Sequence, residues 1–103
     1  WLSLTAYGRR APFGDWVGFG DEVALAGGLF SQNLEGRPEF IADAVADPLT
    51  GIFAALTVMS LLKHNKSGLL DLSLFSVASH CQKKIHRSGA RLRHEHHRPN
   101  LRC

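Results

Sequence analysis

One carboxylate occupies a position from which it can act as a nucleophile. Asp47 is followed by Pro48 and then by a long apolar run. Because an aspartate is ionised at pH 7, it needs no general base before it attacks an electrophile. Asp is also a good helix N-cap and Pro fits the first helical position, so a second reading makes Asp47 a capping residue alone. We expect free N–H groups of Leu49 and Thr50 to point toward its side chain and to stabilise either the carboxylate or a developing oxyanion.

Other candidate residues lie near the start of the chain and just before Asp47. Ser3, Thr5 and Tyr7 belong to an alternating segment, where they either line the edge of a pocket or are ordinary strand-surface residues. Asp43 precedes Asp47 by four positions, so it either shares a proton with that carboxylate or is a solvated loop acid. The residue types alone leave both choices open.

The end of the chain differs in composition from the rest. Residues 82–103 hold seven basic residues and one acid, for a net charge of +6, whereas residues 1–81 hold five basic and eight acidic residues, for −3. The histidine-rich run 94–97, together with Cys81 or Cys103, has metal-binding groups, but the spacing matches no known zinc arrangement and we predict no metal site. The run also lacks aromatic side chains for stacking on bases, so nucleic acid is not an expected partner. We interpret 81–103 as a basic tail without regular structure, or as sequence from an altered reading frame.

The elements that position these residues alternate between strand and helix. In the first part of the chain we predict a strand over 1–7 with Leu2 and Leu4 on its covered face, a loop over 8–20, and a short helix over 21–30 capped by Asp21. A polar connection over 31–40 follows. The second part is predicted to contain a helix over 47–62, a strand over 70–74 and the start of a helix over 75–80. The long helix is expected to bury a broad face, with Phe53, Leu56 and Met59 in the core. This order indicates the α/β class.

Length and composition limit the remaining possibilities. A chain of 103 residues is enough for one domain, and two cysteines exclude a disulfide scaffold. The longest weakly polar run, 49–62, has 14 residues, fewer than the roughly 18 that a membrane-spanning helix needs. We therefore expect no membrane span. No signal peptide is visible, and a first residue other than Met suggests a fragment.

Three segments together resemble a known family. The run 42–56, which contains Asp47 and the small and apolar residues after it, is similar to the family III coenzyme A transferases (CaiB/BaiF type), a superfamily that includes the α-methylacyl-coenzyme A racemases. The segment 68–74 resembles the turn and strand that follow in that family. Upstream, 3–8 resembles its strand ending in an aromatic-glycine turn, and 18–29 its next loop and helix. The resemblance covers 1–80 in the family's order, so we divide the chain into a family segment, 1–80, and a tail, 81–103.

The resemblance implies a partial Rossmann-like domain and a specific reaction. Members form interlocked dimers, and the transferases move coenzyme A between an acyl-coenzyme A and a carboxylic acid through an aspartyl-coenzyme A thioester. By position the nucleophile is Asp47, and Thr5, Tyr7 and Gly8 are expected beside the coenzyme. Coenzyme A thioesters are then substrates, no tightly bound cofactor is expected, and the location is cytoplasmic.

Two departures from the family's pattern define the alternatives. The racemase branch has a histidine where this chain has Gly20, which favours transfer over racemisation. The family's amino-terminal half and its later glycine-rich loop are missing, so we expect an isolated piece to be inactive and to expose apolar surface. The alternative from another functional class is a non-catalytic α/β remnant whose basic tail binds polyanions or metal.

Overall fold

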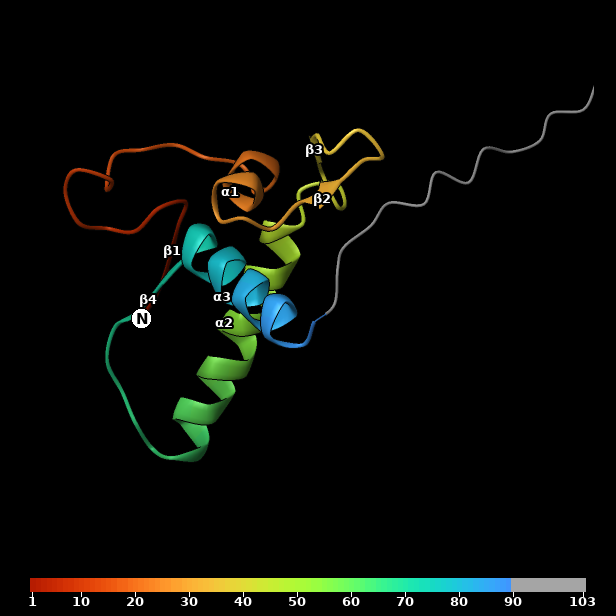
Figure 1. Cartoon of the computed structure of the whole chain (residues 1–103). Helices are drawn as coiled ribbons and strands as arrows, with labels where there is room; N and C mark the ends of the chain where they lie inside the picture. The colour runs from red at the N-terminus through yellow and green to blue at the C-terminus, as the bar shows by residue number, and fades with distance from the viewer. Residues whose placement is uncertain (90–103) are drawn as a thin grey trace, which may run out of the picture.

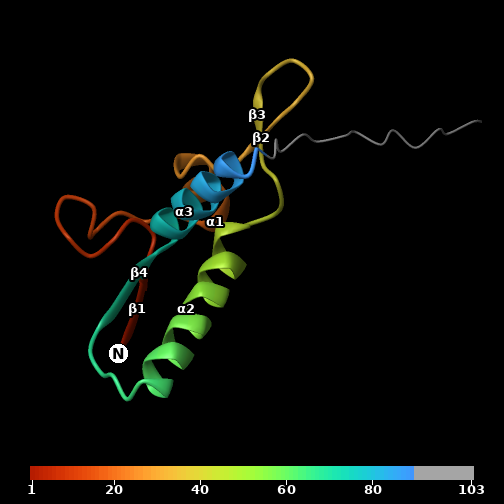
Figure 2. The ribbon, with the colours of Figure 1, turned by 60° about the horizontal axis from the view of Figure 1, so that its bottom comes forward.

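A parallel pair of strands joins the start of the chain to a segment much later in the sequence. The computed structural model describes residues 1–89. Strand β1 (Leu2–Thr5) pairs in parallel with β4 (Leu70–Ser73), with Leu2 opposite Leu70 and Leu4 opposite Leu72 (Figures 1 and 2). Because parallel strands need a crossover connection, the helices between them make this an α/β fold, as predicted. The prediction that Leu2 and Leu4 lie on a covered face of this strand was wrong, since they remain 45% and 49% exposed.

Helix α1 (Gly20–Ala26) follows the long loop that leaves β1. Its N-cap is Phe19, whose N–H donates to the Glu22 carboxylate at 3.0 Å. The prediction that Asp21 caps this helix was therefore wrong, because the helix begins one residue earlier and Asp21 lies in its first turn. Val23 and Ala24 of α1 are buried.

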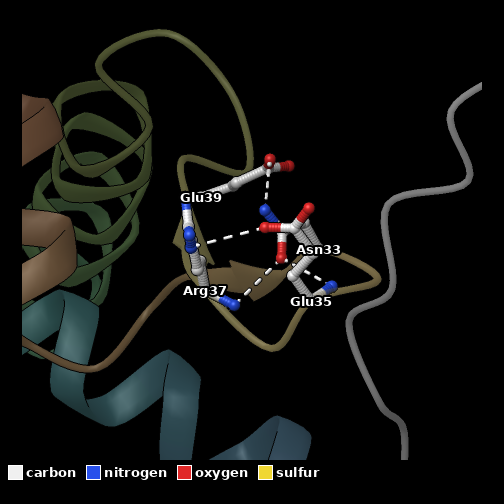
Figure 3. A network of polar contacts seen from close by, with 4 residues as sticks. All are labelled: Asn33, Glu35, Arg37 and Glu39. Carbon is white, nitrogen blue, oxygen red and sulfur yellow. Dashed lines mark hydrogen bonds and ion pairs between the residues drawn. The ribbon is translucent and has the colours of Figure 1, made fainter.

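A small hairpin replaces the predicted polar connection. Strands β2 (Ser31–Gln32) and β3 (Pro38–Glu39) pair antiparallel. In the turn, the Asn33 Oδ1 atom accepts hydrogen bonds from the N–H groups of Glu35 and Arg37, and its Nδ2 donates to Glu39 (Figure 3). Gly36 supplies the positive φ of 78° that the turn requires.

Helix α2 (Ala46–Lys63) confirms the predicted long helix but begins earlier than expected. Its N-cap is Val45, and no side chain caps its first turn. Asp47 is consequently the second helical residue and Pro48 the third, which the helix tolerates because the N–H groups of the first turn have no intrahelical acceptor. The prediction of Asp47 as N-cap was wrong.

The apolar stripe of α2 is not the core that the sequence predicted. Leu56 and Met59 are 62% and 66% exposed, and Phe53 is only half-buried. The buried positions are instead the small residues Ala46 and Ala54 together with Thr50. Both views show the carboxyl-terminal half of α2 extending beyond the other helices (Figures 1 and 2).

The length of α2 bears on the expectation of no membrane span, which stays a prediction. Its 18 residues have a mean hydropathy of 1.2, which is long and apolar enough to cross a membrane by length and composition alone. That test is weak evidence, because a core helix of a soluble protein passes it too.

Helix α3 (Leu74–Arg87) continues directly from β4. The Ser73 side chain caps it by accepting from the Ser76 N–H at 3.2 Å. The helix confirms the predicted start but runs past residue 80, so the expectation of no regular structure was wrong for 81–87. Cys81 and Ile85 pack against the buried cluster of Ala24, Leu29, Ala46 and Ala78. The division into a family segment and a tail stays a prediction.

Candidate functional site

The Asp47 carboxylate lies at the junction of α1 and α2. Asp47 is exposed, in the first turn of α2, and its Oδ2 atom lies against the backbone of Gly20. A Cβ atom at position 20 would overlap this oxygen and would lie 2.6 Å from the Ala44 carbonyl oxygen. Glycine at position 20 therefore makes room for the carboxylate. Within residues 1–89, Asp47 forms no ion pair and caps no backbone N–H.

The segment before α2 fixes where Asp47 sits. Ala44 has a positive φ of 46°, which is uncommon outside glycine. Its N–H donates to the Asp21 carboxylate, and its carbonyl oxygen accepts from the Asp47 N–H at 2.9 Å. Asp21 thus ties the start of α1 to the residues that precede Asp47. Sequence reasoning missed this role, and the 23 positions between the partners leave no local signal for it.

The expected oxyanion donors are not available. The Leu49 N–H donates to the Val45 carbonyl oxygen at 3.4 Å, and Thr50 lies a full turn inside the helix. This follows from the earlier start of α2, which turns both N–H groups into helix donors. The expectation that they face the Asp47 side chain was wrong.

Thr5, Tyr7 and Gly8 form the corner at the carboxyl end of β1. The Thr5 hydroxyl accepts from the Gly8 N–H at 3.0 Å, and Gly8 has a φ of 107°. The Tyr7 ring packs near Trp16, with centroids 5.7 Å apart, and near Phe75 at 6.0 Å. All three residues are half-buried, and the space beside the Gly8 Cα is open.

The loop before α1 brings this corner and Asp47 into one region. A Cβ atom at Gly18 would lie 2.8 Å from the Tyr7 ring, and two residues later Gly20 contacts Asp47. The structure thus places Tyr7 and Asp47 at the two ends of a three-residue segment. Asp43 is exposed on its loop.

Metal-ligand residues do not gather in the described part of the chain. No group of three or more His, Cys, Asp or Glu residues comes together within residues 1–89. The His94–His97 run and Cys103 lie outside the described residues.

Solved structures share this arrangement of elements. Rv3272 from Mycobacterium tuberculosis is 26% identical to this chain, with a TM-score of 0.69 over 85% of it. An aspartate-to-alanine variant of Rv3272 aligns with a TM-score of 0.68. A CaiB/BaiF family protein from Brucella suis, 23% identical, matches 96% of this chain with a TM-score of 0.69. The chain has the fold of one part of a CaiB/BaiF family protein.

The CaiB/BaiF likeness confirms the resemblance and the fold class predicted from the sequence. The chain spans 27% of the length of Rv3272 and 29% of that of the Brucella protein. No protein-family model and no curated protein sequence matches the chain. The likeness therefore rests on the arrangement of helices and strands, and the activity is a matter for proposal.

Proposed function

We propose that the chain is the part of a coenzyme A transferase that carries its carboxylate nucleophile, Asp47. The observation that supports this proposal most directly is the environment of the Asp47 carboxylate. It is exposed at a helix start, serves no cap, and is held against a glycine where a larger residue would not fit. A purely structural N-cap would use its side chain on the N–H groups of the first turn.

The proposed reaction uses Asp47 twice. An Asp47 oxygen attacks the thioester carbonyl carbon of an acyl-coenzyme A, and coenzyme A leaves as a thiolate, which gives a mixed anhydride. The thiolate then attacks the Asp47 carbonyl carbon, the donor acid leaves, and an aspartyl-coenzyme A thioester remains. The acceptor carboxylate attacks this thioester, and the released thiolate attacks the acceptor carbonyl, which restores Asp47.

The surroundings of Asp47 fit a nucleophile that must stay reactive. Hydrogen-bond donors stabilise a resting carboxylate and lower its nucleophilicity. Because Leu49 and Thr50 donate within the helix, they do not compete for the Asp47 oxygens. Position 20 also favours transfer over racemisation, because it holds glycine where the racemase branch of the family has a histidine.

The corner of Thr5, Tyr7 and Gly8 is the proposed contact for the coenzyme. This corner, with its half-buried Thr5 and Tyr7 and its open glycine, lies where the chain leaves β1 and enters the loop that leads to Gly20. Substrate binding, homodimer assembly and a cytoplasmic location are proposals for the complete protein, since this chain spans about a quarter of the solved structures.

The replacement Asp47→Asn tests the proposal in a complete protein that contains this segment. Asn has the same shape but is no nucleophile, so we expect the transfer rate to fall by about a thousandfold or more. The melting temperature should stay unchanged, because Asp47 caps nothing.

Asp43→Asn is the matched control, since it removes a neighbouring exposed carboxylate. We expect near-normal transfer from this variant. Full transfer activity in Asp47→Asn would refute the assignment.

A further inference from the structure

Asp21 is a carboxylate near the proposed nucleophile that the proposed reaction does not use. It is half-buried in the first turn of α1. Its Oδ1 atom accepts a hydrogen bond from the Ala44 N–H, and within the described residues its carboxylate forms no ion pair. The Asp21 side chain is therefore directed at the backbone of the segment that leads into α2.

Helix α1 gives this contact a fixed support. It packs so closely on α3 that a Cβ atom at Gly27 would lie 2.7 Å from the Ala78 Cβ atom. Residues 40–45, by contrast, belong to no helix or strand. The hydrogen bond from Ala44 to Asp21 therefore fastens an irregular segment to a packed helix.

The same contact holds Ala44 in a conformation that alanine rarely adopts. Its φ of 46° lies in the left-handed region, which costs energy for a residue other than glycine. In this conformation the Ala44 carbonyl oxygen accepts from the Asp47 N–H at 2.9 Å and lies beside the Gly20 backbone. The Asp47 carboxylate packs against that same glycine. Without the Asp21 acceptor, Ala44 is expected to relax and the Asp47 carboxylate to move with it.

We propose that Asp21 is a positioning residue for coenzyme A transfer, which acts through the Ala44 backbone to hold the Asp47 carboxylate in place. This inference rests on the proposed function. Because the donor is a backbone N–H, the requirement at position 21 is an acceptor oxygen at the right reach. Asparagine supplies that oxygen, whereas alanine has none and the serine hydroxyl is one atom too short.

Steady-state kinetics of a complete protein that contains this segment test the role. Asp21→Ala should lower kcat about ten- to a hundredfold, the range for a reacting group moved out of place. Its KM for the acyl-coenzyme A should change by less than about twofold, because Asp21 is not a proposed substrate contact. Asp21→Ser, a milder change at a helix start, should show the same loss of kcat. Asp21→Asn should keep kcat within about threefold of the parent.

Glu22→Ala is the matched control. Glu22 lies in the same turn of α1, and its carboxylate also accepts from a backbone N–H, that of Phe19 at 3.0 Å. This bond closes the start of α1 and does not reach the segment before α2. Glu22→Ala should therefore lower the melting temperature, as Asp21→Ala does, but leave kcat unchanged.

Hydrogen exchange of the Ala44 amide provides a readout that does not depend on activity. In the 103-residue chain, Asp21→Ala should speed exchange at Ala44 by about tenfold or more, because local opening no longer breaks a hydrogen bond. Asp21→Asn should keep the parent rate. An unchanged rate in Asp21→Ala would show that the contact does not hold Ala44 and would overturn the proposal.

Three kinetic results would also overturn it. The first is a normal kcat in both Asp21→Ala and Asp21→Ser. The second is an equal loss in Asp21→Asn, which would mean that the charge matters and not the acceptor. The third is an equal loss in Glu22→Ala, which would reduce the effect to general stability. Failure of the proposed function is a different result, namely full transfer activity in Asp47→Asn.

Discussion

At the scale of single residues, Gly20 and Asp47 form a pair that depends on the absence of a side chain. Gly20 is buried at the start of α1, and both an Asp47 oxygen and the Ala44 carbonyl oxygen occupy the space that a Cβ atom would need. The exposed carboxylate is therefore held by packing against backbone. This arrangement places the carboxylate at a defined point without using it as a cap.

The substitution Gly20→Ala should cost stability through this contact. Because one of the two clashing atoms belongs to the backbone, we expect a loss of about 1–3 kcal/mol in the free energy of unfolding, measured by urea denaturation. The control is Gly51→Ala in α2, where a Cβ atom meets nothing within 4 Å and alanine should add about 0.5–1 kcal/mol. Equal stability of Gly20→Ala and the parent chain would contradict the packing that we describe.

Cys81 makes the stability of the chain depend on pH in the alkaline range. Burial raises the pKa of its thiol above 9.0, so the folded state disfavours the thiolate. This contribution to stability is complete below the unfolded pKa and is lost as the pH rises through the folded pKa. Relative to Cys81→Ser, the parent chain should lose free energy of unfolding as the pH rises above about 8.5, the ordinary pKa of a cysteine thiol. Parallel pH profiles for the two chains would show that the thiol ionises equally well in both states.

At the scale of elements, α2 is apolar around most of its circumference. Its buried positions are small, and larger side chains such as Ile52, Leu56 and Met59 face outward. A helix that is apolar all round belongs in the interior of a larger protein or in a membrane. In a protein about four times as long, further elements are expected to cover this face.

Lysine substitutions separate the two faces of α2. Leu56→Lys should change the stability of this chain by no more than about 0.5 kcal/mol, since Leu56 is mostly exposed here. Ala54→Lys places a charge at a buried position, and we expect it to disrupt the packing of α2 against its neighbours. A thermal melt of this variant should show no cooperative transition. A large loss of stability in Leu56→Lys would show that this face is covered within the chain.

The same helix shows what sequence reasoning can and cannot find. Alternation and helical spacing predicted β1, α2 and β4 in the correct order, because those periods follow from local geometry. They did not predict which face of α2 is buried, since an apolar residue lies on nearly every face. The end of α3 was missed because its last turn is dominated by Lys84, His86 and Arg87.

In the candidate site, too, some features were predicted from the sequence and others were not. Asp47 and the corner of Thr5, Tyr7 and Gly8 were predicted from residue type and from the family resemblance, and their roles stay predictions. The Asp21 contact with Ala44 and the fit of Gly20 against Asp47 join segments more than 20 residues apart, and no local pattern encodes them. The early start of α2 also moved Asp47 from the cap into the helix, which changed the donors around it.

At the scale of the whole molecule, the chain exposes more apolar surface than a self-contained domain does. Parallel sheets are normally covered on both faces, yet this sheet has two strands and its Leu2 and Leu4 side chains are half-exposed. Exposed apolar patches of this kind promote association. The likeness to about a quarter of each solved structure is consistent with surfaces that other parts of a protein would cover.

The isolated chain should therefore associate as its concentration rises. Size-exclusion chromatography with light scattering should give a mass that increases with concentration, and the double variant Leu56→Lys, Met59→Lys should shift it toward the monomer. The control pair Lys63→Gln, Lys66→Gln changes exposed positions without removing apolar area and should leave the association unchanged. A monomer at all concentrations would mean that the exposed apolar residues do not drive contact.

The most direct test of the central claim is to trap the covalent intermediate on Asp47. A complete protein that contains this segment is incubated with an acyl-coenzyme A, quenched with hydroxylamine, and digested for mass spectrometry. An aspartyl thioester or anhydride should yield a hydroxamate on the peptide that contains Asp47, and Asp47→Asn should abolish it. A hydroxamate on another residue, or none during measurable coenzyme A transfer, would contradict the assignment of Asp47 as the nucleophile.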